Sequence, residues 1–345
     1  MSAPRPAALM DAEIREQPQV WQRLLASGQF AAVAAEIRRR APRMVLLAAR
    51  GTSDHAALYA KYLVEIRLEL PAGLISPSTM TAYGATPDLR DVLVIAVSQS
   101  GGSPDLVRTV EVARRQGALT VAVTNNAASE LGSAAELHLD VLAGPELSVA
   151  ATKTYTAQQL ALYLLVDALR GGSDSARGLP DLGSGLLEQD ERIAEQAQRY
   201  RFAQRLVTTA RGYSYPTARE AALKLMETSY LSAQAFSGAD LMHGPLAIVD
   251  SSVPVLAVVA DGPGGAAMHP VLERVTGAGA DVFTVGTRAA VAASTSGIVL
   301  PDGVPEELSP ILEILPFQRL AMHLAVARGE NPDAPRGLRK VTETL

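Results

Sequence analysis

The sequence predicts an α/β protein made of two tandem doubly wound domains, each a parallel sheet with helices on both faces. Short apolar runs that end in turn residues alternate with helical patterns, which is typical of parallel sheets. A stretch of the first half also recurs in the second half at a near-constant offset, which indicates an internal duplication of one α/β unit. With 345 residues and 48% hydrophobic residues, the chain is long enough for two hydrophobic cores.

The first half contains the clearer alternation of elements. We predict helices over 10–40, 54–67 and 104–116, and strands over 44–49, 92–97 and 119–123. Asp11 is the candidate N-cap of the first helix, because its carboxylate can accept a hydrogen bond from a free helix amide. The first strand leads through Arg50-Gly51 into the next helix, so strand ends and loops should share one edge of the sheet.

The second half repeats these segments in the same order. Residues 209–214 echo 48–53, residues 255–259 echo 94–98, and residues 279–280 echo 117–118. We predict an N-terminal helical segment over 1–30, a first domain over 31–170, a linker over 171–191, a second domain over 192–327 and a C-terminal tail over 328–345. The loop 98–103 carries three serines, whereas 261–265 has no hydroxyl, so we expect only one copy to keep an anion site.

Composition excludes several classes of protein. A net charge near −5 gives no reason to expect nucleic acid or an anionic membrane as a partner. The absence of cysteine excludes disulfides, a thiol nucleophile and a thiolate metal site, and the five histidines lack metal-ligand spacing, so we expect no metal. The chain has no apolar run long enough to span a membrane and no secretory signal in its first 30 residues, and we therefore expect a soluble cytoplasmic protein.

Lysine is rare in this chain. Of the 31 basic residues, only Lys61, Lys153, Lys224 and Lys340 are lysines, and the rest are arginines. A primary amine can lose its proton when it is desolvated and can form a Schiff base with a carbonyl, whereas a guanidinium does neither. Lys224 and Lys340 have charged neighbours in the sequence, which makes them candidates for such chemistry. Codon usage is the alternative explanation, and under it all four are ordinary lysines.

The loop 98–104, with the sequence Ser-Gln-Ser-Gly-Gly-Ser-Pro, is the candidate anion site. It joins an apolar strand to a helix N-terminus, where free amides and the helix dipole favour a phosphate, and its hydroxyls can donate further hydrogen bonds. The loop has neither the lysine of a nucleotide P-loop nor GxGxxG spacing, which argues against nucleotides. The alternative is an ordinary Ser/Gly turn with Ser103 as N-cap and Pro104 at the first helical position.

Glu220, Lys224 and Glu227 are spaced to share one face of a helix predicted over 217–229. Their neighbours on that helix are apolar, so we expect partial burial, which makes the pKa of a glutamate tunable for proton transfer. The alternative is an ordinary surface pair of glutamate and lysine. Local sequence favours a structural role for His243, and it gives no function to Lys340, which lies in a tail of a kind that is usually solvated.

Taken together and in order, these segments resemble the sugar isomerase (SIS) domain family. The resemblance is strongest to the isomerase half of glutamine–fructose-6-phosphate aminotransferases and to the synthase-like glucosamine-6-phosphate deaminases. The matching segments are Arg50-Gly51-Thr52-Ser53, Ser98-Gln99-Ser100-Gly101, Ala150-Ala151-Thr152-Lys153, Ala222-Leu223-Lys224-Leu225 with Glu227, His243-Gly244-Pro245-Leu246 and Leu338-Arg339-Lys340. The resemblance covers nearly the whole chain and implies two flavodoxin-like domains.

The resemblance also implies a role for each matching residue. Phosphosugar-binding positions correspond to Thr52, Ser53, Ser98, Gln99, Ser100, Ser103, Val149 and Ala151. Glu227 corresponds to the residue that moves a proton between C1 and C2, and Glu220 and Lys224 to the helix pair that supports it. His243 corresponds to a ring-opening histidine donated by the neighbouring subunit of a homodimer. Lys340 corresponds to the lysine with which the C-terminal tail reaches the sugar carbonyl.

Departures from the family pattern narrow the expected reaction. The chain has no cysteine to serve as a glutaminase nucleophile, so we expect no ammonia from glutamine, and Met226, Met242 and Ala151 replace polar residues of the synthases. We expect conversion of glucosamine 6-phosphate to fructose 6-phosphate and ammonia, with no cofactor. The alternatives are another phosphosugar isomerase, deaminase or deglycase, a synthase module without its glutaminase, and a non-catalytic phosphosugar sensor.

Overall fold

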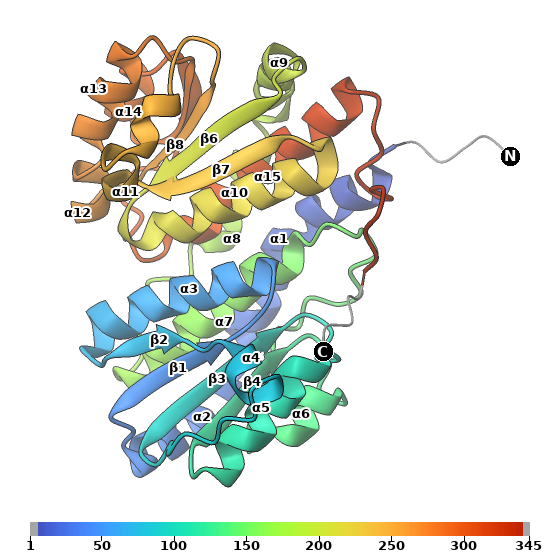
Figure 1. The fold of residues 1–345 in the computed structure, drawn as a ribbon, viewed down its shortest axis with the longest axis vertical. Helices are drawn as coiled ribbons and strands as arrows, with labels where there is room; N and C mark the ends of the chain where they lie inside the picture. The colour runs from blue at the N-terminus through green and yellow to red at the C-terminus, as the bar shows by residue number, and fades with distance from the viewer. Residues whose placement is uncertain (1–5, 341–345) are drawn as a thin grey trace, which may run out of the picture. The chain divides into compact units, whose positions relative to one another are not determined.

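The computed structural model describes residues 6–340, which form two compact units, each built around one parallel sheet (Figure 1). The first-sheet unit comprises residues 19–146 and 153–177 together with Arg339 and Lys340, and the second-sheet unit comprises 6–18, 147–152 and 178–338. The two sheets confirm the predicted α/β class with tandem parallel sheets. The domain limits expected from the sequence stay a prediction.

The first sheet has the strand order β2-β1-β3-β4-β5, and all neighbouring strands are parallel. The strands are β1 Met44–Ala48, β2 Ala72–Leu74, β3 Val92–Ser98, β4 Leu119–Thr124 and β5 Leu137–Asp140. Val45 lies opposite Leu93, which lies opposite Leu119. β3 and β4 are buried almost throughout, because helices cover both faces of the sheet, and this explains their continuous apolar sequences.

The helices of the first-sheet unit follow the strands in the predicted alternation. They are α2 Gln29–Arg40, α3 Thr52–Leu63 with its π-helical extension η1 Val64–Leu68, α4 Pro77–Thr81, α5 Pro104–Arg115, α6 Glu130–Ala134 and α7 Lys153–Leu169. The single helical segment expected over 10–40 is instead two helices, because α1 Ala8–Ala26 ends before Gly28 and α2 begins after it. α1 belongs to the second-sheet unit up to Pro18 and to the first-sheet unit after it.

The second sheet has the order β10-β9-β8-β6-β7, which repeats the strand order of the first sheet. Its strands are β6 Arg205–Ala210, β7 Ser232–Ser237, β8 Val255–Val259, β9 Val282–Gly286 and β10 Ser296–Val299. Its helices are α8 Leu179–Leu187, α9 Asp190–Tyr200, η2 Gly212–Ser214, α10 Tyr215–Ser229, α11 Gly238–Met242, η3 Pro245–Ile248, α12 Pro263–Ala266, α13 His269–Gly277, α14 Arg288–Ala292 and α15 Ser309–Ala327. Residues 171–191, expected to form a linker, include α8.

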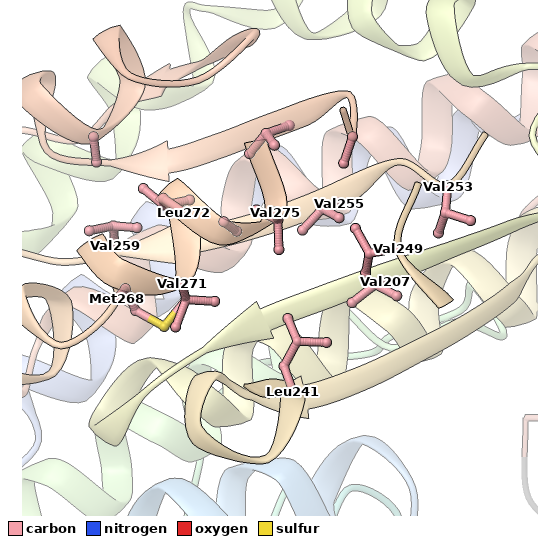
Figure 2. Close-up of a cluster of buried hydrophobic side chains, with 14 residues drawn as sticks. Val207, Leu241, Val249, Val253, Val255, Val259, Met268, Val271, Leu272 and Val275 are labelled. Carbon is pink, nitrogen blue, oxygen red and sulfur yellow. The ribbon is translucent and has the colours of Figure 1, made fainter. Parts of the chain in front are cut away.

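A cluster of buried aliphatic side chains forms one core of the second-sheet unit (Figure 2). Val255 and Val259 of β8 and Val271 and Val275 of α13 belong to it, together with Val207 of β6. The strand valines pack against the helix valines, and the cluster removes their apolar side chains from water. None of the described helices is long and apolar enough to cross a membrane.

The start of α1 is capped by the C-terminal segment and not by Asp11, so that prediction was wrong. The amides of Leu9 and Met10 donate to the carboxylate of Asp333, at 3.0 and 2.8 Å. Asp11 lies inside the helix, where it pairs with Arg15 and with the buried Arg319. The segment around Asp333 is therefore held against α1 by hydrogen bonds, whereas its composition alone suggested a solvated tail.

Candidate active site

The loop after β3 closes on itself through serine hydroxyls. The Ser98 hydroxyl accepts a hydrogen bond from the amide of Gly101 at 3.1 Å, and the Ser100 hydroxyl accepts one from Gly102 at 3.3 Å. Gly101 has a φ of +68°, and a Cβ there would lie 2.2 Å from the Ser129 hydroxyl oxygen. Only glycine fits this turn, which brings the backbone close to the edge of the sheet.

Ser103 occupies the N-cap position of α5 and Pro104 begins the helix, the positions that the alternative of an ordinary Ser/Gly turn assigned to them. The Ser103 hydroxyl does not cap the helix, however, and within residues 6–340 it makes no hydrogen bond. This hydroxyl therefore stands at the N-terminus of a 12-residue helix with its donor proton unused. A donor at such a place suits an anionic ligand.

Two helices begin side by side at the carboxyl ends of the neighbouring strands β1 and β3. The chain leaves β1 toward the β2 edge of the sheet and leaves β3 toward the β4 edge, so this is the topological switch point at which open α/β sheets bind ligands. Both Nε and a terminal nitrogen of Arg50 lie 2.8 Å from the buried Asp105 Oδ2, and this ion pair joins the two turns. Ser53, in the first turn of α3, accepts a hydrogen bond from Gln158 at 3.0 Å.

In the second-sheet unit, α10 brings three of the predicted residues together. Lys224 Nζ lies 2.5 Å from Glu227 Oε2 and 3.4 Å from Glu220 Oε1. The side chains of Lys224 and Glu220 are fully buried, whereas that of Glu227 is 23% exposed. This is not an ordinary surface pair. The cluster fixes the orientation of Glu227, the one of its two carboxylates that solvent or a ligand can reach.

His243 lies outside this cluster. It ends α11, is exposed, and its side chain makes no hydrogen bond or ion pair with the residues that the structure describes. Gly244, which follows it, has a φ of +130° that favours glycine. No cluster of three metal-ligating side chains is found within the described part of the chain.

Val149 and Ala151 lie half-buried in the segment between β5 and α7. Glu13, itself nearly buried, holds the start of this segment by accepting from the amides of Leu147 and Ser148, the latter at 3.2 Å. Sequence reasoning missed Glu13 as a site-supporting residue, because its partners lie more than 130 residues away in the chain. Its place in the first helix, with apolar residues around it, was the only signal.

Lys340 is held by a carboxylate that the sequence did not single out. Its ammonium lies 3.1 Å from Oε2 of Glu146, whose side chain is fully buried in the first-sheet unit. Of the other lysines, Lys61 forms a half-exposed pair with Glu65 on the surface, and Lys153 is buried at the start of α7. The lysines thus differ in burial: Lys153 is buried, whereas Lys61 and Lys340 are partly exposed.

The second copy of the loop is occupied by the protein's own carboxylate. Glu306 Oε1 accepts hydrogen bonds from the amides of Gly264 and Gly265, at 2.7 and 3.3 Å. Burial raises the pKa of Glu306, and the hydrogen bonds from these two amides oppose that rise. The amides that correspond to the first loop are therefore already used in the second copy. That the first copy keeps an anion site stays a prediction.

A fully buried glutamate contacts the start of α10. Glu313 of α15 accepts hydrogen bonds from the hydroxyls of Ser214, at 2.8 Å, and Thr217, at 3.0 Å. Burial raises its pKa to about 8, and the two hydroxyl donors only partly oppose this. Sequence reasoning missed Glu313 because it is the lone acidic residue of a mostly apolar helix.

The two parallel sheets with the same strand order define an α/β protein built from a duplicated unit. A model of the SIS domain matches residues 39–168 and 200–279. The chain therefore belongs to the SIS domain family.

Sequence similarity to named proteins supports membership of this family. The chain is 36% identical over 309 residues to the isomerizing glutamine–fructose-6-phosphate aminotransferase of Thermococcus kodakarensis, covering 86% of this chain and 51% of the relative. It is 34% identical to the enzyme of the same name from Pyrococcus horikoshii, covering 95% of this chain and 56% of the relative. The chain thus spans about half the length of the curated relatives it matches.

Solved structures show the same fold. A protein of Silicibacter pomeroyi, provisionally assigned as a phosphosugar isomerase, superposes with a TM-score of 0.85 at 36% identity, covering 94% of this chain and 99% of that one. The C-terminal domain of glucosamine–fructose-6-phosphate aminotransferase from Francisella tularensis superposes with a TM-score of 0.85 at 27% identity, covering 96% of this chain and 99% of that one. The glucosamine-6-phosphate deaminase of Thermotoga maritima, at 20% identity and a TM-score of 0.79, covers 98% of this chain and all of that one and shows likeness of fold.

Proposed function

We propose that this protein is a phosphosugar isomerase that converts glucosamine 6-phosphate to fructose 6-phosphate and ammonia. The observation that carries the proposal is the arrangement on α10, where buried Lys224 and Glu220 fix a partly exposed Glu227. A positioned carboxylate of this kind can move a proton between neighbouring carbons. Membership of the SIS domain family and the names of its relatives support a phosphorylated sugar as substrate.

The first-sheet loop would bind the phosphate. Its free Ser103 hydroxyl and the N-termini of α3 and α5 offer donors without adding a positive charge, which suits a dianion that must bind reversibly. Thr52, Ser53, Ser98, Gln99 and Ser100 are the other residues proposed for the phosphosugar, with Val149 and Ala151 along the sugar.

The reaction would proceed by enolisation. His243 assists opening of the sugar ring, which exposes the C1 aldehyde. Glu227 then removes the proton from C2 and returns it to C1. The C1 oxygen takes up a proton and the C2 amine gives one up, so that C1 becomes an alcohol and the amine becomes an imine. Water adds to the imine carbon and ammonia leaves, giving the ketone of fructose 6-phosphate. Lys340 would contact the carbonyl, and this route requires no metal or cofactor.

We further propose that the site is shared between two copies of the chain. His243 is exposed and unpaired within residues 6–340, as expected of a side chain that acts on a neighbour. Mixing two inactive variants, His243→Ala and Glu227→Gln, would restore about a quarter of the activity if subunits exchange at random in a homodimer, since half of the dimers carry one complete site. Failure of the mixture to regain activity after refolding together would contradict sharing.

The test of the reaction is ammonia release from glucosamine 6-phosphate, with fructose 6-phosphate measured in the same sample. Glu227→Gln should abolish turnover and leave phosphosugar binding largely intact. Glu65→Gln is the matched control, because Glu65 also pairs with a lysine on a helix but on the surface. Normal turnover in Glu227→Gln would overturn the assignment.

The alternative functions predict different results in the same assay. Galactosamine 6-phosphate or fructosamine 6-phosphate as the sole productive substrate would indicate a different deaminase or deglycase, and aldose–ketose exchange without ammonia would indicate a plain isomerase. Formation of glucosamine 6-phosphate from fructose 6-phosphate and free ammonia would favour a synthase module. Binding without any turnover would indicate a sensor, although a sensor has no need of the buried cluster on α10.

A further inference from the structure

We propose that Glu146 is a positioning residue that fixes the amine of Lys340 for the reaction. The inference rests on the proposed function and deepens it. The starting observation is that Glu146 has no exposed side-chain area, yet it lies 3.1 Å from the ammonium of a lysine near the end of the described chain. A carboxylate in such a place needs a partner, because burying an unpaired charge costs several kcal/mol.

Glu146 is itself held rigidly. Its Oε1 accepts from the amide of Thr154 at 3.1 Å, and its Oε2 accepts from the Thr154 hydroxyl at 2.6 Å. Thr154 is in the first turn of α7, where the helix dipole favours a negative charge. The lysine ammonium shares Oε2 with the threonine hydroxyl, so the position of the amine is set relative to a 17-residue helix.

The same carboxylate also closes a loop. Glu146 and Thr154 lie at the two ends of the segment that contains Val149 and Ala151, the residues proposed to run along the sugar. One side chain thus fixes both ends of that segment and the reactive amine of the tail. A misplacement of about 1 Å can cost a reaction roughly 100-fold, so a residue that fixes both should matter for turnover more than for binding.

A purely structural role is the competing explanation, because Glu146 would stabilise the start of α7 even without Lys340. The two explanations differ in their coupling to the lysine. If Glu146 acts through Lys340, removing its charge should have no further effect once the amine is gone. If it only stabilises the fold, its effect on activity should be the same with or without the amine.

The experiment compares Glu146→Gln, Lys340→Met and the double variant, each assayed for kcat and KM on glucosamine 6-phosphate. We expect Glu146→Gln to lower kcat by about 10- to 100-fold with a small change in KM, and to leave the residual kcat of Lys340→Met unchanged. Glu306→Gln is the matched control, because Glu306 also accepts backbone amides but contacts no lysine, and its kcat should equal that of the unmodified protein. Equal loss in both backgrounds would overturn the proposal.

A second readout does not depend on turnover. Arg339 is exposed, and trypsin should cleave after it several-fold faster in Glu146→Gln than in the unmodified protein, because the neighbouring lysine is no longer held. If the unmodified protein turns over no phosphosugar, the proposed function fails while this measurement still decides whether Glu146 holds the tail. An unchanged cleavage rate would contradict our inference.

Discussion

Replacing Lys224 by methionine tests whether the cluster on α10 is a buried charge network. Methionine keeps the length of the side chain and its apolar stem but removes the ammonium that lies 2.5 Å from Glu227 and 3.4 Å from Glu220. Glu220 would then be a fully buried carboxylate without its lysine, and breaking a buried pair in this way costs about 3–5 kcal/mol. At about 2–4 °C per kcal/mol for a unit of this size, the melting temperature should fall by roughly 10 °C.

Differential scanning calorimetry and urea unfolding at pH 7 would measure this loss. Lys61→Met is the matched control, since Lys61 forms a similar pair with Glu65 at 2.8 Å but with both side chains partly exposed, and such pairs contribute less than about 1 kcal/mol. Lys224→Met with Glu220→Gln should recover part of the stability, because the buried negative charge is then removed as well. A free energy of unfolding for Lys224→Met within about 1 kcal/mol of the unmodified protein would refute the reasoning.

Three further predictions follow from individual contacts. Gly101→Ala should weaken inorganic phosphate binding at least tenfold, because its Cβ would collide with Ser129, whereas Gly102→Ala, whose nearest neighbour is 3.8 Å away, should change the titration little. Glu313→Gln should flatten the pH dependence of stability. The pKa of Glu313 is about 8 in the folded protein against 4.5 in the unfolded chain, so the folded protein holds a proton that the unfolded chain has lost, and the unmodified protein loses about 1.4 kcal/mol of stability per pH unit between these two values relative to the variant. Thermal melts from pH 5 to 9 would measure this difference. Glu306→Ala should lower the free energy of unfolding by about 1–3 kcal/mol through two unsatisfied amides, without changing phosphate affinity measured by calorimetry.

The strands were predictable from the sequence because apolar runs bounded by turn residues leave few alternatives. The runs at 92–97 and 119–123 became β3 and β4 with their ends shifted by one residue or less. The break between α1 and α2 was missed, since Gly28 lies inside a continuous helical periodicity and glycine only weakens a helix. The capping of α1 by Asp333 could not be predicted at all, because it joins positions more than 320 residues apart.

In the candidate site, too, features set by neighbouring residues were predictable, whereas contacts between distant residues were not. The spacing of Glu220, Lys224 and Glu227 put them on one helix face, and the apolar neighbours correctly indicated burial. The supporting contacts of Glu146 and Glu13 were missed, because their partners are distant in the sequence and come close only in the folded chain. Sequence motifs identify residues that touch a ligand more readily than residues that hold those residues in place.

The corresponding strand ends of the two duplicated units differ in how their hydrogen-bond donors are used. At the first switch point, Ser53 is paired with the neutral Gln158, and the Ser103 hydroxyl is unused by any described residue. At the corresponding edge of the second sheet, Ser214 is paired with the carboxyl group of Glu313, and the loop amides are taken by Glu306. An incoming phosphate would find these donors already occupied and would meet the side chain of Glu306, which disfavours its binding there. The second unit instead contains α10, whose Glu227 is the residue proposed to move the proton.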